Sequence, residues 1–331
     1  MEIRESTAEI SVGGVKIGGS SDVTVQSMCN TKTDDVEATV AQIKELQAAG
    51  CDIVRLAIPD TAAAEAIDRI KAQVSVPLVA DIHFNHKLAL IAAERGIDKI
   101  RINHGIPIRI GVNAGSLEAR LIEKYGHPCA EAMVESARGH IALLNKYGFD
   151  DICLSLKASS VPLTVAAYRL ASTEFKYPLH LGVTETGTAW NGTIQSAVGI
   201  GTLLSEGIGN TIRVSLTAPP VEEVKTGIAI LKACGLRKGV KLVSCPTCGR
   251  TQIDLITLAH QVEERIKDLK GDLTVAVMGC VVNGPGEARE ADYGIAGGKD
   301  CGLLFRKGEI LGKYPYEQLC DALIELIEKD T

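Results

Sequence analysis

The sequence predicts an α/β protein whose N-terminal part is a TIM (β/α)8 barrel, and two observations carry this prediction. Short runs rich in Val, Ile and Leu alternate with Ala-rich stretches of helical periodicity, the order expected when helices join parallel strands. The composition agrees, because 33 glycines and only 4% aromatic residues accompany 46% hydrophobic residues, which is typical of strands buried on both faces. With 331 residues, the chain is long enough for two domains with filled cores.

Eight runs predict the eight strands of the barrel, which we place at residues 1–237. Amphipathic helices separate most of these runs. One is DVEATVAQIKELQAAG at 35–50, in which Asp35 is the expected N-cap and Gly50 the expected stop. The runs are VTVQSM (23–28), DIVRLA (52–57), PLVADIH (77–83), DKIRIN (98–103), IPIRIGVN (106–113), DICLSLK (151–157), PLHLGVT (178–184) and NTIRVSL (210–216).

One connection is too short for this topology. Only His104 and Gly105 separate the fourth run from the fifth, whereas a parallel crossover needs about a dozen residues. Either these runs are not neighbouring parallel strands, or a segment with a helix is missing from the chain. We favour the missing segment, because both runs carry matched Arg and Asn residues, and we expect the native protein to exceed 35.1 kDa.

Polar side chains gather in the C-terminal halves of these strands. Residues two apart share a strand face, so the parity of each run places several polar residues inside the barrel, at the end where TIM-barrel active sites form. One such cation could simply pair with Asp or Glu. Four arginines and one lysine together favour a strongly anionic small ligand with two phosphates. The residues are Arg55, Asp81, His83, Arg101, Asn103, Arg109, Asn113, Ser155, Lys157, Arg213 and Ser215.

The remaining residues, 238–331, predict a smaller α+β domain with thiols at its strand ends. Strands are expected at 240–245 and 273–280, helices near 254–269 and 316–329, and a hairpin at 301–314. Cys245 and Cys248 form a Cys-x-x-Cys turn after the first strand, and Cys280 ends the second. If the two strands are neighbours, the three sulfurs meet at one edge of the sheet.

Three kinds of site are consistent with these cysteines. A structural zinc site normally has four Cys or His ligands in two paired spacings, and a thioredoxin-type disulfide would use only the first pair. A 4Fe-4S cluster needs four ligands, which the three cysteines and nearby Glu287 would supply. The spacing favours the cluster over zinc, with zinc as the alternative.

Composition and charge exclude several other classes of protein. The formal net charge of −6 argues against nonspecific binding of nucleic acid. The start of the chain, MEIRESTAEISVGG, lacks the apolar core of a signal peptide, and no stretch approaches the roughly 18 apolar residues of a membrane span. We therefore expect a cytoplasmic protein whose ten cysteines are core residues or ligands, not disulfides.

Several long motifs resemble the family of 4-hydroxy-3-methylbut-2-en-1-yl diphosphate synthases, and together they cover nearly the whole chain. The resemblance implies a TIM barrel followed by an iron-sulfur domain like the sulfite-reductase repeat. It also implies a 4Fe-4S cluster on Cys245, Cys248, Cys280 and Glu287. The motifs are VQSMCNTKTDD, ADIHF, IRIGVNAGSLE, SLKAS, PLHLGVTETG, SAVGIG, RVSLTAPPVEEV, SCPTCGR and GCVVNGPGEAREAD.

The reaction implied by this resemblance is the reductive ring opening and dehydroxylation of 2-C-methyl-D-erythritol 2,4-cyclodiphosphate. Two electrons arrive through the cluster from flavodoxin or ferredoxin, and a homodimer is implied in which each cluster domain caps the partner's barrel. Glu185 is the candidate proton donor to the departing hydroxyl, with a salt bridge to a barrel arginine as the alternative role. The expected substrate-binding residues are Arg55, His83, Arg101, Arg109, Asn113, Lys157, Arg213 and Ser215.

Two other functions remain as alternatives at this stage. The small domain could be a zinc-stabilised interaction module on a phosphate-binding barrel, in which case the protein would be colourless and zinc removal would unfold the domain. A pterin-dependent transferase on the same kind of barrel is disfavoured, because such chemistry has no use for the C-terminal thiols.

Overall fold

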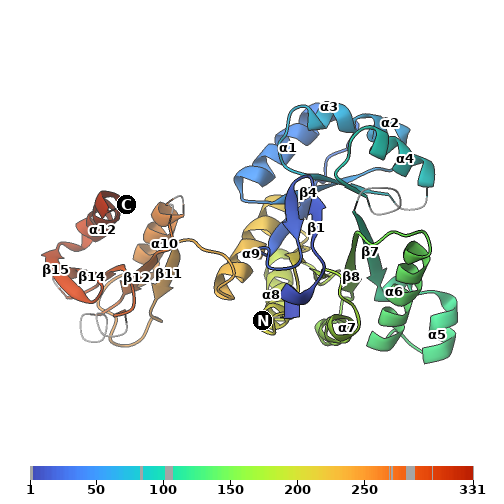
Figure 1. Cartoon of the computed structure of the whole chain (residues 1–331). Coiled ribbons are helices and arrows are strands. Elements are labelled where there is room, and N and C mark those ends of the chain that lie inside the picture. The colour runs from blue at the N-terminus through green and yellow to red at the C-terminus, as the bar shows by residue number, and fades with distance from the viewer. Residues whose placement is uncertain are drawn as a thin grey trace. The chain divides into compact units, whose positions relative to one another are not determined.

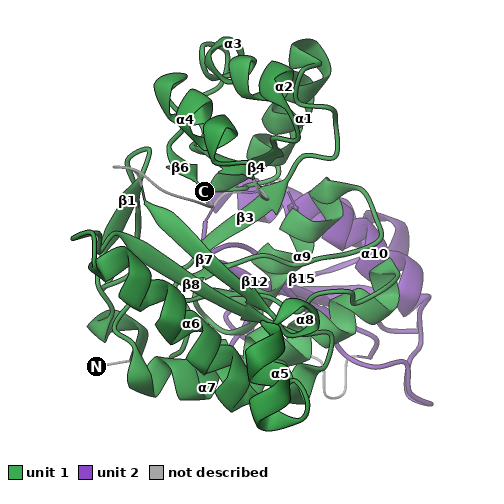
Figure 2. Cartoon of the chain, turned by 90° about the vertical axis from the view of Figure 1, so that its right-hand side faces the viewer, with its two compact units in different colours: residues 1–237 green, residues 238–331 purple. Residues whose placement is uncertain are grey.

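The chain forms two compact units, unit 1 (residues 1–237) and unit 2 (residues 238–331), coloured separately in Figure 2. The computed structural model describes residues 3–82, 85–100, 107–267, 269, 271–280, 288–299 and 301–330.

Unit 1 is built on one eight-stranded parallel sheet (Figure 1). Its order is β8-β7-β6-β5-β4-β3-β10-β9, and a parallel bridge between Leu154 and Leu179 joins the two outer strands, so the sheet closes into a barrel. Each predicted run contains one of these strands, and the predicted fold class is confirmed. The strands are β3 (Thr24–Met28), β4 (Ile53–Ala57), β5 (Leu78–Asp81), β6 (Lys99–Ile100), β7 (Ile108–Asn113), β8 (Ile152–Lys157), β9 (His180–Leu181) and β10 (Thr211–Ile212).

Helices cover the outside of this barrel. In α1 the Asp35 carboxylate accepts a hydrogen bond from the Ala38 N–H at 3.1 Å, as expected of an N-cap. The strands bury Val54, Leu154 and Leu156 against the helices in one core, so the alternate residues of each strand face the barrel interior. The helices are α1 (Val36–Ala48), α2 (Thr61–Glu65), α3 (Ile67–Lys71), α4 (His86–Glu94), α5 (Ala119–Tyr125), α6 (Ala130–Asn145), α7 (Val161–Glu174), α8 (Ala189–Ser205) and α9 (Pro220–Ala233), with short 3-10 helices at Ile3–Ser6 and Ala114–Ser116.

The connection that is too short for a parallel crossover joins β6 and β7, which are neighbouring strands. β6 and β7 pair in parallel through Ile100 and Ile108. Of the two explanations offered for the short crossover, the one in which these runs are not adjacent parallel strands is therefore wrong. Of the residues between them, 101–106 lie outside the described residues.

Unit 2 is an α+β unit, as predicted. Its sheet has the order β11-β12-β13-β14-β15, parallel across the first three strands and antiparallel across the last three. Two helices bury Leu258, Val262 and Ile327 against Val275 and Ile295 of the sheet. The elements are β11 (Lys241–Ser244), α10 (Leu255–Ile266), β12 (Thr274–Met278), β13 (Tyr293–Ala296), β14 (Gly302–Arg306), β15 (Glu309–Tyr314), the 3-10 helix Tyr316–Gln318 and α12 (Leu319–Asp330).

Within the part of the chain that the structure describes, no helix has the length and apolar character required to cross a membrane.

Candidate functional site

Five charged or polar side chains are buried in the interior of the barrel, from Arg109 near the start of β7 to Asp81 and Lys157 at the C-terminal ends of their strands. Each exposes 7% of its surface or less, although burial of a charge is costly unless it is paired. Their positions follow from the two-residue period of the strands, because their sequence neighbours form the outer core. They are Arg55 on β4, Asp81 on β5, Arg109 on β7, and Ser155 and Lys157 on β8.

Contacts between neighbouring strands hold the arginines of this group. Arg55 Nε lies 3.7 Å from Asp81 Oδ2 and also donates to Met28 Sδ at 3.1 Å. Arg109 Nη1 donates to Ser155 Oγ at 3.1 Å. The guanidinium groups therefore have fixed positions before any ligand arrives, which lowers the entropy cost of binding.

Lys157 is a buried lysine at the end of β8, level with Asn113 at the end of β7. A Cβ on Gly182, which follows β9, would lie 2.7 Å from the Arg213 carbonyl oxygen and 2.6 Å from Lys157 Nζ, so a side chain there would displace both groups. Burial first, and then three nearby arginines, hold the pKa of Lys157 well below its usual range. An anionic ligand would relieve this repulsion. The arginines are Arg109, Arg213 and Arg55.

Arg213 follows β10 and pairs with a carboxylate that sequence reasoning missed. Its Nη2 lies 3.4 Å from Oε2 of Glu223, a buried residue in the first turn of α9. Strand parity could not find Glu223 because it stands on a helix. The acidic pair Glu222–Glu223 lies in the first turn of the helix that follows Arg213, but this local pattern does not record the contact between the carboxylate and the arginine.

Asn113 and Ser215 also lie at this end of the barrel. Asn113 ends β7 and is the register partner of Lys157. Ser215 is half-buried, and its carbonyl accepts a hydrogen bond from the Thr186 hydroxyl. Asn113 is thus level with Lys157, and Ser215 lies two residues after Arg213.

Glu185 stands in a strained part of the loop after β9. Its φ of 58° lies in the left-handed region, which costs a residue other than glycine about 1 kcal/mol or more. The side chain is exposed, while the next residue, Thr186, is buried and hydrogen-bonded to the Ser215 carbonyl. The loop is therefore tied to the segment after β10, with Glu185 at its surface.

A second polar layer lies deeper in the barrel, and sequence reasoning missed it as well. Lys99 and His180 are fully buried. Burial, and next the charge of Lys157, hold the pKa of His180 well below its usual range, so the imidazole is neutral. The strand period would have located both residues, because Lys99 precedes Arg101 by two and His180 precedes Gly182 by two.

Two of the expected substrate-binding residues, His83 and Arg101, lie outside the described residues. The same is true of Asn103 and of Glu287, the expected fourth ligand of the cluster.

In unit 2 the two predicted ligand cysteines that follow strands, Cys245 and Cys280, lie at the same edge of the sheet. β11 and β12 are adjacent parallel strands, with Ser244 level with Val277, so Cys245 and Cys280 both follow the carboxyl ends of neighbouring strands. Cys245 Sγ accepts a hydrogen bond from the Gly279 N–H at 3.2 Å. Such N–H···S bonds are typical around thiolates that ligate iron-sulfur clusters.

Cys248 is exposed on the turn that follows. The backbone N–H and then the side chain of Arg250 lower the pKa of its thiol, which favours the thiolate that binds metals. Among the described residues, no three Cys, His, Asp or Glu side chains stand close enough to hold a metal ion. The thiol chemistry and the shared sheet edge nevertheless suit a soft, sulfur-ligated metal group.

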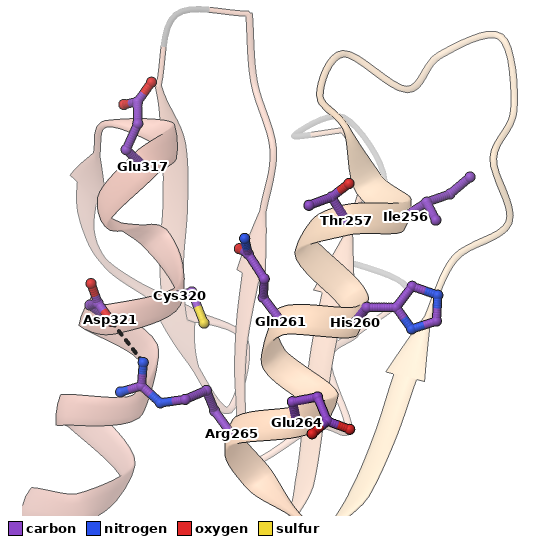
Figure 3. Close-up of a pocket in the computed structure, with 9 residues that line it drawn as sticks. All are labelled: Ile256, Thr257, His260, Gln261, Glu264, Arg265, Glu317, Cys320 and Asp321. Atoms are coloured by element: carbon purple, nitrogen blue, oxygen red, sulfur yellow. Dashed lines mark hydrogen bonds and ion pairs between the residues drawn. The ribbon is translucent and has the colours of Figure 1, made fainter.

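Unit 2 also carries a surface hollow of about 710 Å³ between α10 and α12 (Figure 3). Arg265 and Asp321 form an ion pair of 3.0 Å in it, and Ile256 and Cys320 are among the other lining residues. None of the predicted site residues that the structure describes lines this hollow.

The chain matches the models of one protein family along most of its length. A family model described as the GcpE TIM-barrel domain matches residues 7–106 and 103–228, and one described as the GcpE protein C-terminal domain matches 241–329. A Geobacter sulfurreducens protein named 4-hydroxy-3-methylbut-2-en-1-yl diphosphate synthase (flavodoxin) is 58% identical over 347 aligned positions, covering 99% of this chain and 98% of that protein. A Clostridium perfringens protein of the same name is 56% identical, covering 98% of this chain and 99% of that protein.

Among solved structures, dihydropteroate synthase from Stenotrophomonas maltophilia is similar in fold. It covers 69% of this chain and 97% of its own, with a TM-score of 0.52 and 14% sequence identity. At this identity the similarity concerns the barrel fold alone.

Proposed function

The chain belongs to the GcpE family of 4-hydroxy-3-methylbut-2-en-1-yl diphosphate synthases, and we therefore propose that it reductively opens 2-C-methyl-D-erythritol 2,4-cyclodiphosphate. The 58% identity over nearly the full length of a named relative carries this proposal. Two electrons and one proton convert the cyclic dianion into the product trianion and one water. The bond from a ring carbon to the bridging phosphate oxygen breaks, and a hydroxyl leaves as water.

We infer that the diphosphate binds at the mouth of the barrel. The buried cations there would be stabilised by the phosphate charges, and the fixed guanidinium groups are suited to bidentate contacts with phosphate oxygens. Asn113 and Ser215 would add neutral hydrogen bonds. His83 and Arg101 are proposed on the strength of the family motifs. The cations described are Arg55, Arg109, Lys157 and Arg213.

Glu185 is proposed to deliver the proton to the departing hydroxyl. Its exposed side chain stands on a loop that Thr186 anchors to the Ser215 carbonyl, two residues after Arg213. Because this hydrogen bond holds the strained loop, the Glu185 carboxyl has a defined position, which general acid catalysis requires.

The cofactor is proposed to be a 4Fe-4S cluster held by Cys245, Cys248, Cys280 and Glu287. The shared sheet edge of the thiols, the N–H donated to Cys245 Sγ and the lowered pKa of Cys248 support this assignment. When bound, the cluster supplies electrons one at a time. The residues of this chain would hold it, and the absent Cβ at Gly279 keeps space beside Thr251, which a side chain would approach to 2.9 Å.

Flavodoxin is the proposed electron donor, with ferredoxin as the alternative, because the relatives carry flavodoxin in their names. We also propose a homodimer. Helix α8 supports it with three large apolar side chains on one face, Trp190, Ile194 and Val198, which are 76%, 46% and 53% exposed. Residues four apart share a helix face, and contiguous exposed apolar surface marks interaction sites.

The first test is anaerobic purification followed by iron, sulfide and zinc analysis and an activity assay with the cyclic diphosphate and reduced flavodoxin. We expect about four irons and four sulfides per chain, a brown absorbance, and formation of the allylic diphosphate by mass spectrometry. Zinc without sulfide, together with absent turnover, would instead support a phosphate-binding barrel with a zinc module.

A further inference from the structure

Glu223 joins three separate parts of the barrel through one carboxylate. Oε2 lies 3.4 Å from Arg213 Nη2 and accepts a hydrogen bond from Ser27 Oγ of β3 at 3.3 Å. Oε1 accepts the Leu216 N–H at 3.0 Å. The residue is 6% exposed and stands in the first turn of α9, where the helix dipole favours a negative charge.

Two of these contacts fix groups that the proposed reaction uses. The contact to Arg213 sets the direction of its guanidinium group. The contact to Leu216 sets the backbone directly after Ser215, whose carbonyl also anchors the Glu185 loop through Thr186. A single carboxylate therefore controls the geometry of the segment 213–216.

The charge of Glu223 is unfavourable for binding an anion. It lies near the cation cluster and raises the pKa of Lys157, against the effect of the arginines. A carboxylate in this position weakens the attraction of the site for a diphosphate. If its role were only to tune charge, the site would bind anions better without it. Its contacts indicate a role in geometry.

We propose that Glu223 is a positioning residue of the reaction, which aims Arg213 and the Ser215 segment at the substrate without touching the substrate itself. This inference rests on the proposed function of the barrel mouth. Removal of this carboxylate has two effects in opposite directions. It increases the positive charge of the site, which favours binding of an anion, and it loosens Arg213, which lowers kcat.

The test is Glu223→Gln, with Glu222→Gln as the matched control. Glutamine retains an oxygen for the Leu216 N–H but cannot form the ion pair with Arg213. Glu222 is the neighbouring residue, half-buried and paired with Lys225 at 2.9 Å. We expect Glu223→Gln to lower kcat at least tenfold while calorimetry shows inorganic pyrophosphate binding as tightly as to wild type or more tightly.

A second readout follows Arg213 without turnover. Phenylglyoxal modifies guanidinium groups, and peptide mass spectrometry locates the product. We expect Arg213 to react several-fold faster in Glu223→Gln and at the wild-type rate in Glu222→Gln. If the wild-type protein fails to turn over the cyclic diphosphate, the proposed reaction is wrong, and the Arg213 rate still decides whether Glu223 positions this side chain.

Two results would overturn the inference: a wild-type kcat with unchanged Arg213 reactivity, or a parallel loss of pyrophosphate binding, kcat and melting temperature, which indicates a structural role. Should Glu223→Gln fold poorly, Glu223→Asp keeps the charge but is shorter by one methylene. Faster modification of Arg213 in that variant supports positioning, and the wild-type rate contradicts it.

Discussion

Lys157 places an ammonium group among three guanidinium groups in a part of the barrel where water screens little. Because its pKa is lower in the folded state than in the unfolded chain, the unfolded chain binds more protons between those two pKa values. This side chain therefore destabilises the fold progressively as pH falls from its unfolded pKa, about 10.4, toward the lowered folded value. The cations that suit the substrate thus weaken the ligand-free protein.

Replacement of this lysine separates stability from binding. We expect Lys157→Met to melt at least 2–4 °C above wild type at pH 7, where about 1 kcal/mol corresponds to that shift in a domain of this size. The advantage should shrink as pH rises toward the unfolded pKa, because the unfolded chain then has less free energy to gain by protonating this lysine. Pyrophosphate binding should fall at least tenfold in calorimetry.

Lys44→Met, at an exposed position on α1, is the control for this experiment. Its melting temperature should follow that of wild type at both pH values. A Lys157→Met protein that is less stable than wild type at pH 7, or that binds pyrophosphate normally, would contradict the assignment.

Cys280 allows a test of the proposed cluster that leaves the barrel intact. Cys280→Ser removes a soft thiolate ligand, so we expect loss of the visible absorbance and of turnover. Pyrophosphate binding, which depends on unit 1, should be unchanged in calorimetry. Cys320→Ala on α12 is the matched control and should retain iron, sulfide and activity. Full turnover by Cys280→Ser would exclude this residue as a ligand.

At this scale the sequence was informative wherever a simple period governs side-chain direction. Arg55, Arg109 and Lys157 could be predicted because strands alternate their faces. Glu223 could not, since a helix residue reaches the site only through a tertiary approach that no local pattern records. The same two-residue period also places His180 inside the barrel. In the sequence, however, a single histidine in an apolar run looks like an ordinary core residue.

At the scale of elements, the N-terminal hairpin is the part of the barrel that the sequence prediction overlooked. β1 (Ile10–Val12) and β2 (Val15–Ile17) pair through a turn at Gly13 and Gly14, with φ of 53° and 90°. A Gly-Gly pair between two short alternating runs is a hairpin signal. The runs are only three residues long, and in the part of the chain that the structure describes they pair only with each other, so the repeated strand-helix pattern does not include them.

This hairpin closes the N-terminal end of the barrel. Ile10, Val12 and Ile17 form one apolar cluster with Ile53 and Cys153 of the barrel interior. The polar site at the other end is thereby separated from solvent below. The hairpin thus supports the site without contributing a residue to it.

A charge placed in this cluster should unfold unit 1 selectively. Val12 is fully buried, and Val12→Asp buries an unpaired carboxylate, which costs about 3 kcal/mol or more. We expect the melting temperature of unit 1 to fall by at least 6 °C. The matched variant Ser11→Asp, at the exposed position of the same strand, should melt within 1–2 °C of wild type. Calorimetry that gives Val12→Asp the wild-type transition would show that the hairpin does not stabilise the barrel.

At the scale of the whole molecule, the apolar face of α8 predicts how two copies associate. A groove of about 440 Å³ between α8 and α9 is lined by small residues such as Ala197, Gly201 and Ala229, next to the exposed side chains of Trp190 and Val198. Large and small apolar groups on one face can be self-complementary, as a two-fold interface requires.

Trp190 is the single tryptophan of the chain, so its fluorescence reports on this face alone. We expect its emission maximum to shift to shorter wavelength as protein concentration rises, in step with dimer formation in sedimentation velocity. Val198→Glu should keep the protein monomeric and its emission red-shifted. Leu143→Glu, at a 56% exposed position on α6, should dimerise normally. Equal dimerisation of both variants would place the interface elsewhere.

The chain is shorter than its relatives, and the connection between β6 and β7 is the place where we expect the difference. The alignment with the Geobacter sulfurreducens relative spans 347 positions, 16 more than the 331 residues of this chain, so that relative has at least 16 residues without a counterpart here. The two parts of the barrel-family match meet at residues 103–106, between the strands whose parallel pairing requires a crossover of about a dozen residues. We therefore expect intact-mass spectrometry of the native protein to give more than 35.1 kDa, with the additional peptide mapping between Asn103 and Ile106. A mass of 35.1 kDa would mean that this barrel closes with the shorter connection.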